Sequence, residues 1–224
     1  MKTVINGFAS AALGLIVFGL LLFLPARTLN YWQAWVFLGV FALSTWIPSV
    51  YLLRTNPAAL ERRMRAGPLA EARTLQRVVI TVLFICFPAM FVLSAFDHRN
   101  GWFAVPTALI VVGDILVAVG LGVAMLVIIQ NSYASANINV EVEQTVVTTG
   151  LYGLVRHPMY AGNVIMMLGV PLALGSYWGL VFVIPGVVVL ALRIRDEEVL
   201  LEQQLPGYGD YEQQVHYRLV PHVW

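Results

Sequence analysis

The sequence is poor in charge. Only 11% of its 224 residues are charged, against roughly 25% in an average globular protein, and 59% are hydrophobic. A soluble fold of this size needs far more charge to cover its surface. The composition therefore excludes an ordinary water-soluble domain and indicates that lipid is the solvent for most of the chain. The length suits one domain.

The low net charge and the small numbers of cysteines and histidines exclude further classes of function. The formal net charge is only +1, which argues against nucleic acid as a partner because phosphate binding needs clustered, uncompensated Lys and Arg. The single cysteine, Cys86, excludes an intramolecular disulfide, and its apolar surroundings predict a buried, inert thiol. Four histidines, with His216 and His222 set apart in the tail, leave little for a metal site, and we expect none.

Long apolar stretches are abundant. A helix needs about 20 residues to cross a hydrocarbon core of about 30 Å, and six stretches approach or exceed that length: 5–24, 32–53, 78–96, 103–130, 159–174 and 177–192. They predict an all-α, polytopic integral membrane bundle of about six transmembrane segments. We expect residues 1–130 to supply four N-terminal transmembrane helices and residues 131–224 to form the functional core.

The last two stretches are short, 16 residues each, and Gly175-Ser176-Tyr177 joins them. They predict a tight helical hairpin, and their length leaves open whether it spans the whole bilayer. If the N-terminus is cytoplasmic, eleven Lys or Arg residues fall on the cytoplasmic side and only Arg27 and Arg99 on the other. Positively charged loops stay inside, so we expect both termini and the active site to be cytoplasmic.

Two features of the first half carry separate expectations. Asn56 followed by Pro57 is the pattern of a helix N-cap and first helical residue, and it predicts a short helix lying on the anionic leaflet. Asp114 stands in the middle of an apolar stretch, where a charge costs at least about 2.5–3.5 kcal/mol on insertion scales. We expect Asp114 to face the bundle interior; its role stays open between a structural hydrogen bond and a substrate contact.

The polar residues of the C-terminal third lie in two segments, 130–156 and 193–224. The predicted hairpin between them is too short to form a domain alone, so both segments must meet at one membrane face. They predict a cytoplasmic pocket roofed by loops and floored by membrane helices.

Two motifs stand at the edges of this predicted pocket. Arg-His-Pro (156–158) opens a helix, and the N–H groups of that helix end, together with Arg156, favour an anion such as a carboxylate. Arg193 and Glu197 are four residues apart and share a helix face, with Glu198 next in sequence. An intrahelical ion pair is the simpler explanation of that spacing.

The combination is more specific than its parts. GLYGLVRHPMYAGN (150–163), an apolar hairpin, RxxxEE (193–198) and GYGDYEQQV (207–215) together resemble the isoprenylcysteine carboxyl methyltransferase and phospholipid methyltransferase superfamily. The resemblance covers roughly residues 130–224, whereas the first helices match only in being hydrophobic.

The resemblance implies an S-adenosylmethionine-dependent methyltransferase that holds its cofactor without a Rossmann domain. Arg193 matches the substrate-side arginine of the family and, with Glu197 and Glu198, makes up the implied catalytic set. The implied cofactor contacts are Asn137, Gln144, Thr145, Val146, Val147, Tyr152, His157, Pro158, Met159, Tyr160 and Glu197. The implied acceptor is a lipophilic molecule that comes from the bilayer, most like a prenylcysteine carboxylate; methylation of a phospholipid or another lipid on N or O stays open.

These residue types suit that chemistry. Methyl transfer from a sulfonium is an in-line displacement, so the protein mainly positions and desolvates the reactants. A carboxylate acceptor needs no general base, and Arg193 is suited to hold it by a bidentate contact. An amine or phenol acceptor must lose a proton, which a neighbouring Glu or Tyr would take.

Two alternative functions remain at this stage. A sterol-reductase-like enzyme would share the C-terminal helices but use a nicotinamide cofactor, and a small transporter or membrane scaffold would be no enzyme at all. Transporters usually carry inverted repeats, and we find no internal repeat in this sequence. The tail tyrosines Tyr208, Tyr211 and Tyr217 have a simpler interpretation as interfacial anchors. The acceptor's identity and the oligomeric state do not follow from the sequence.

Overall fold

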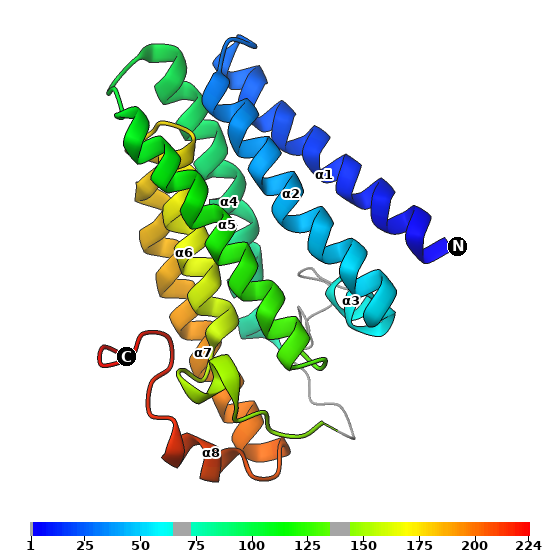
Figure 1. Ribbon diagram of the computed structural model, residues 1–224. Coiled ribbons are helices and arrows are strands. Elements are labelled where there is room, and N and C mark those ends of the chain that lie inside the picture. Colours follow the sequence, from blue (N-terminus) through cyan, green and yellow to red (C-terminus); the bar gives the residue numbers. More distant parts are fainter. Residues whose placement is uncertain (1, 65–72, 135–143) are drawn as a thin grey trace.

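The computed structural model describes residues 2–64, 73–134 and 144–224, and in these ranges all regular structure is helical (Figure 1). This confirms the predicted all-α bundle. The elements are α1 (Lys2–Ala26), α2 (Trp32–Thr55), α3 (Pro57–Met64), α4 (Thr74–Asn100), α5 (Thr107–Gln130), the 3-10 turn η2 (Gly150–Gly153), α6 (Pro158–Ala173), the 3-10 turn η3 (Trp178–Phe182), α7 (Val183–Gln204) and α8 (Tyr208–Gln214).

Six apolar helical segments correspond to the six predicted stretches. Within the described residues, α2, α4, α5 and the continuous segment Trp178–Gln204 are long and apolar enough to cross a membrane, and α6 and the Ala12–Ala26 part of α1 are shorter apolar helices. Large apolar side chains point outward; Ile184 on α7 is 69% exposed and Phe84 on α4 is 58% exposed. An outward apolar surface of this kind is what a lipid environment requires.

The hairpin differs from the sequence-based expectation in one respect. Helix α6 has 16 residues and is therefore about 24 Å long at 1.5 Å per residue, short of the hydrocarbon thickness. Helix α7, however, does not end with its apolar run at residue 192 but continues to Gln204. The polar end of α7 stays helical because Arg193 and Glu198, both buried, find partners on neighbouring elements.

Helices α5 and α6 are packed backbone to backbone. A Cβ added at Gly120 would lie 2.5 Å from the carbonyl oxygen of Gly162, and one at Gly113 would lie 2.2 Å from the amide nitrogen of Ala173. Small residues allow this close approach between membrane helices. Gly120 therefore serves helix packing, and the contact brings the N-terminus of α6 against the C-terminal half of α5 (Figure 1).

An aromatic core joins α1, α2 and α4. Phe18 stacks on Phe91 with ring centroids 4.9 Å apart, and Phe37 contacts Phe91 at 5.5 Å. At the far end, the hydroxyl of Tyr31 donates to the carbonyl of Leu174 at 2.7 Å, which ties α2 to the hairpin turn.

The remaining expectations for the first half can now be compared with the structure. Asn56 Oδ1 accepts a hydrogen bond from the Ala59 amide at 3.1 Å, which confirms the N-cap of α3. Asp114 is buried in α5, and its Oδ1 atom has no hydrogen-bond partner. Cys86 is buried, as predicted.

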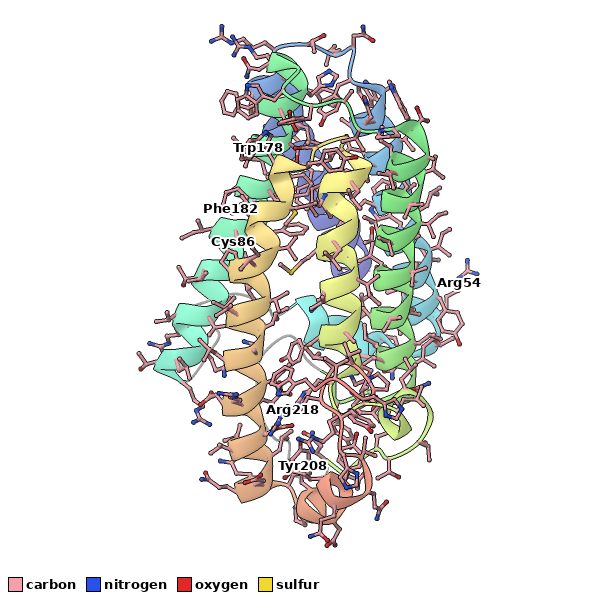
Figure 2. All side chains as sticks on the ribbon, turned by 90° about the vertical axis from the view of Figure 1, so that its left-hand side faces the viewer. Arg54, Cys86, Trp178, Phe182, Tyr208 and Arg218 are labelled. Atoms are coloured by element: carbon pink, nitrogen blue, oxygen red, sulfur yellow. The ribbon has the colours of Figure 1, made fainter. Side chains whose placement is uncertain are left out.

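The polar segments meet at one end of the bundle, where α4 and α6 begin and α5 and α7 end; we call this the pocket end. Figure 2 shows Tyr208 and Arg218 at the pocket end and Trp178 at the opposite end. Helix α8 lies at the bottom of the bundle in Figure 1, below α7. That the pocket end faces the cytoplasm stays a prediction.

Candidate active site

A pocket lies at the pocket end between the two polar segments and the helices that carry them. It encloses roughly 840 Å³ of empty space, part of it open to solvent. Its described lining residues are Asn131, Tyr133, Ala134, Gln144, Thr145, Val146, Val147, Tyr152, Arg156, His157, Pro158, Met159, Tyr160, Arg193, Glu197, Leu201, Leu205, Tyr208 and Tyr211.

Most of the residues proposed from the sequence lie together in this lining. Gln144 to Val147 form one wall, Tyr152 and residues 157–160 another, and Arg193 and Glu197 come from α7. Asn137 lies outside the described residues. Glu198 is buried and is not among the described lining residues.

The backbone of the Arg-His-Pro motif is held by the C-terminal tail. The Arg156 amide donates to the carbonyl of Tyr217 at 2.8 Å, and the His157 amide donates to the carbonyl of Arg218 at 2.9 Å. Pro158 then starts α6 without needing an amide partner. The tail therefore fixes where α6 begins. The sequence of residues 150–163 alone gives no sign of this role of the tail.

Glu198 is the centre of a buried charge cluster. The Nε atoms of Arg156 and Arg218 donate to its two carboxylate oxygens at 2.8 and 2.7 Å, and His157 Nε2 lies 3.1 Å from Oε1. Arg156 also pairs with Glu212 of α8 at 2.9 Å. Removing one member of such a cluster leaves a buried charge without compensation and typically costs about 3–5 kcal/mol. The cluster joins α6, α7, α8 and the tail.

The expectation that Arg156 would help to bind an anion from outside takes a different form in the structure. Arg156 is 6% exposed, and the anions it binds are the protein carboxylates Glu198 and Glu212. The sequence pattern indicated an anion partner correctly but not which anion, because Glu212 is 56 residues away along the chain.

The second polar group is a chain of hydrogen bonds on the pocket side of α7. Arg193 Nε donates to the Tyr160 hydroxyl at 2.9 Å, and this hydroxyl donates to Glu197 Oε2 at 2.6 Å. The arginine is 3% exposed. Tyr160 thus stands between the two residues whose four-residue spacing suggested a direct ion pair.

Tyrosines form another side of the pocket. Tyr208 and Tyr211 are buried rather than interfacial, and the Tyr211 hydroxyl donates to the carbonyl of Tyr152 at 2.7 Å. Burial, together with the charge of Glu197, raises the pKa of Tyr152 to about 12, so its hydroxyl stays protonated at neutral pH. The Tyr208 hydroxyl is buried without a hydrogen-bond partner. An unsatisfied hydroxyl on a pocket wall is suited to a polar group of a ligand.

Sequence reasoning assigned no site role to several of these residues. Tyr208 and Tyr211 were interpreted as membrane anchors, although their spacing of three after Gly207, which has φ +85°, is that of one helix face. The sequence pattern gives Gln76 of α4 no site role, yet it is fully buried against Arg193. A lone glutamine at the start of an apolar helix was the available signal.

The sequence was compared with models of known protein families. Residues 108–206 match the family model described as phospholipid methyltransferase. No curated protein matches the chain. The matched stretch contains α5 from its second residue, the Arg-His-Pro motif, α6 and α7. It includes Arg193, Glu197 and Glu198, whereas Glu212 and Arg218 of the charge cluster lie outside it. The family supports a membrane methyltransferase that acts on lipids and favours it over the reductase and transporter alternatives. Residues 108–206 of this membrane protein are thus similar to phospholipid methyltransferases, a family of the superfamily that also includes the isoprenylcysteine carboxyl methyltransferases.

Proposed function

We propose that the chain transfers a methyl group from S-adenosylmethionine to an acceptor carried by a membrane lipid or lipid-like molecule. The observation that carries this proposal is the Arg193–Tyr160–Glu197 chain, which lines the pocket where α6 and α7 leave the membrane. A polar cofactor from the water and an acceptor from the bilayer can meet only at such a junction.

The lining suits the cofactor. The carboxylate of Glu197 can accept hydrogen bonds from a ribose or an amino group, and the tyrosine rings offer faces that attract a sulfonium cation. The unsatisfied hydroxyl of Tyr208 supplies a further polar contact. We assign the cofactor to Gln144, Thr145, Val146, Val147, Tyr152, His157, Pro158, Met159, Tyr160 and Glu197, and Asn137 stays a prediction. When bound, S-adenosylmethionine supplies a methyl group on a positively charged sulfur.

The protein's own contribution is to position and desolvate. Tyr160 bonds to both Glu197 and Arg193, and we assign Glu197 to the cofactor and Arg193 to the acceptor. Because Nε of Arg193 already donates to Tyr160, the arginine would hold an anionic acceptor through its terminal nitrogens rather than through the Nε edge. Glu198 contacts Arg156, His157 and Arg218 of the tail. We assign it a positioning role, because it holds these residues in place.

Among acceptors, a prenylcysteine carboxylate suits the buried Arg193 best. A carboxylate needs no proton removed before it attacks, and a guanidinium is the matching donor. The test is transfer of radiolabelled methyl from S-adenosylmethionine to an S-prenylcysteine analogue by the purified protein in detergent. A product that releases its label in alkali as methanol is a methyl ester and would support this acceptor.

The family description favours a second acceptor, the amine of a phospholipid headgroup. An amine must lose its proton, and Glu197 is the described carboxylate in the lining that would take it. Phosphatidylethanolamine vesicles in the same assay distinguish the two, because an N-methyl product keeps its label in alkali. Label in neither acceptor, with binding of NADPH instead, would contradict the proposal.

The pocket end is proposed to face the cytoplasm because ten of the eleven Lys or Arg residues assigned to that side occur after residue 53, in the segment 54–77 and in the two polar segments 130–156 and 193–224. Cysteines introduced near Arg218 should then resist an impermeant label applied from outside, whereas cysteines near Arg27 should react. Labelling near Arg218 from outside would reverse this orientation.

A further inference from the structure

Gln76 is a buried polar residue whose neighbours in sequence are exposed. It lies in the first turn of α4 and is fully buried, while its neighbours Leu75 and Val78 are 43% and 55% exposed. Helix α4 therefore turns this one amide inward, toward α7. Residue 76 lies before the segment 108–206 that matches the methyltransferase family.

The Gln76 amide joins two groups of opposite charge on α7. Its nitrogen donates to the carboxylate of Asp196, and its oxygen accepts from Nη1 of Arg193 at 2.9 Å. A carboxylate can only accept and a guanidinium can only donate, so a side chain between them must do both. These two contacts also decide which end of the amide is oxygen.

The far side of Asp196 is fixed as well. Arg73, just before α4, pairs with Asp196 at 2.6 Å. A continuous series of polar contacts thus runs from Arg73 through Asp196, Gln76 and Arg193 to Tyr160 in the pocket. Helices α4, α7 and α6 take part in turn.

Two of these contacts fix the plane of the Arg193 guanidinium. Tyr160 accepts from Nε, and Gln76 accepts from Nη1, so the group cannot turn without breaking one of them. A planar donor that must present its terminal nitrogens to an acceptor depends on such a fixed plane.

We propose that Gln76 is a positioning residue that sets the orientation of Arg193 for the methyl acceptor. This rests on the proposed function, in which Arg193 holds the acceptor. Acceptor recognition then depends on a helix outside the family-matched segment, whereas cofactor binding depends on residues inside it.

The experiment compares two variants with a control. Gln76→Leu keeps size and burial but offers no hydrogen bond. Arg73→Gln, the control, removes the outer contacts to Asp196, an ion pair and a long hydrogen bond to its carbonyl, from an arginine that is partly exposed. Single-turnover methyl transfer to the S-prenylcysteine analogue and to phosphatidylethanolamine is measured in detergent, together with S-adenosylmethionine affinity by calorimetry. In Gln76→Leu, transfer to the acceptor that the wild type uses should fall about tenfold or more, as expected for a lost hydrogen bond to a charged group, with cofactor Kd within about twofold. Arg73→Gln should stay within about twofold in both.

Gln76→Glu tests the role of Gln76 through the pH dependence of methyl transfer, which a purely structural role would not change. The introduced carboxyl can satisfy both neighbours only when protonated, because its charged form faces Asp196. Transfer by this variant should therefore recover as pH falls, relative to wild type. This arm also serves if Gln76→Leu does not fold.

The outcomes separate the two ideas. Wild-type transfer rates in Gln76→Leu, or equal losses of transfer and cofactor affinity, would overturn the role of Gln76 while the proposed function stands. A pH profile of Gln76→Glu parallel to wild type would overturn it too. If the wild type binds no S-adenosylmethionine, the proposed function fails and this inference falls with it.

Discussion

Glu197 and Glu198 are neighbours in sequence and have different surroundings. Glu198 points into a cluster of Arg156, His157 and Arg218 and is nearly inaccessible to solvent. Glu197 faces the pocket and accepts from Tyr160. Successive residues on a helix are about 100° apart, so one Glu-Glu pair serves two sides of α7. Two adjacent glutamates of one motif therefore have different surroundings: the carboxylate of Glu198 bonds within the fold, and that of Glu197 faces the pocket.

The largest effect expected from this comparison is loss of stability at Glu198. Glu198→Gln removes the charge that compensates Arg156 and Arg218 and should destabilise the folded protein by about 3–5 kcal/mol. Thermal unfolding of the purified protein in detergent measures it. Glu202→Gln, one turn further along α7 and exposed, is the matched control and should change stability by no more than about 0.5 kcal/mol. Equal effects of the two changes would remove the special role of Glu198.

The next effect concerns Glu197. Glu197→Gln should leave the unfolding temperature near wild type but weaken S-adenosylmethionine binding about tenfold or more, since a hydrogen bond to a charged group is worth about 1.5–3 kcal/mol. His157→Ala or Tyr160→Ala should also weaken it about tenfold by removing lining contacts. Calorimetric titration measures the affinities. If Glu197→Gln lowers stability but leaves the S-adenosylmethionine affinity unchanged, Glu197 has a structural role like that of Glu198 and does not bind the cofactor.

Arg193 is expected to affect turnover rather than cofactor affinity, in contrast to Glu197. Arg193→Lys keeps the charge but cannot contact Tyr160 and Gln76 at once. Turnover should fall sharply, about tenfold or more, while cofactor affinity stays near wild type. Single-turnover rates set beside the titration decide it. Parallel losses in Arg193→Lys and Glu197→Gln would favour a purely structural contact between these residues.

The smallest effect involves Tyr152. Its pKa of about 12 is above the ordinary value of about 10, so folding favours the neutral hydroxyl. The stabilising contribution is fully present below about pH 10 and is lost as pH rises through about 12. Tyr152→Phe should therefore leave the shape of the pH–rate profile between about pH 6 and 9 unchanged. A new inflection in that range would show that Tyr152 titrates during turnover.

Much of the fold followed from composition and apolar length, because a membrane helix is specified locally by its own residues. The pocket was also predictable in outline, since residues 144–160 and 193–197 carry polar groups that lipid would reject. What sequence reasoning missed depends on contacts between distant elements. Glu212 reaches Arg156 from α8, and Gln76 reaches Arg193 from α4. Neither contact can be predicted from the residue spacing along one helix, because the two partners lie on different elements. The length of α7 was missed for the same reason, because its charged residues are stabilised by partners elsewhere.

We propose that this pocket binds S-adenosylmethionine through the Glu197 side of α7. Calorimetric titration of the wild type and of Glu197→Gln, both purified in detergent and shown to be folded by their unfolding temperatures, tests it most directly. We predict saturable binding of S-adenosylmethionine by the wild type and affinity about tenfold or more weaker in Glu197→Gln. No binding by the folded wild type, or equal affinity in both proteins, would contradict the claim.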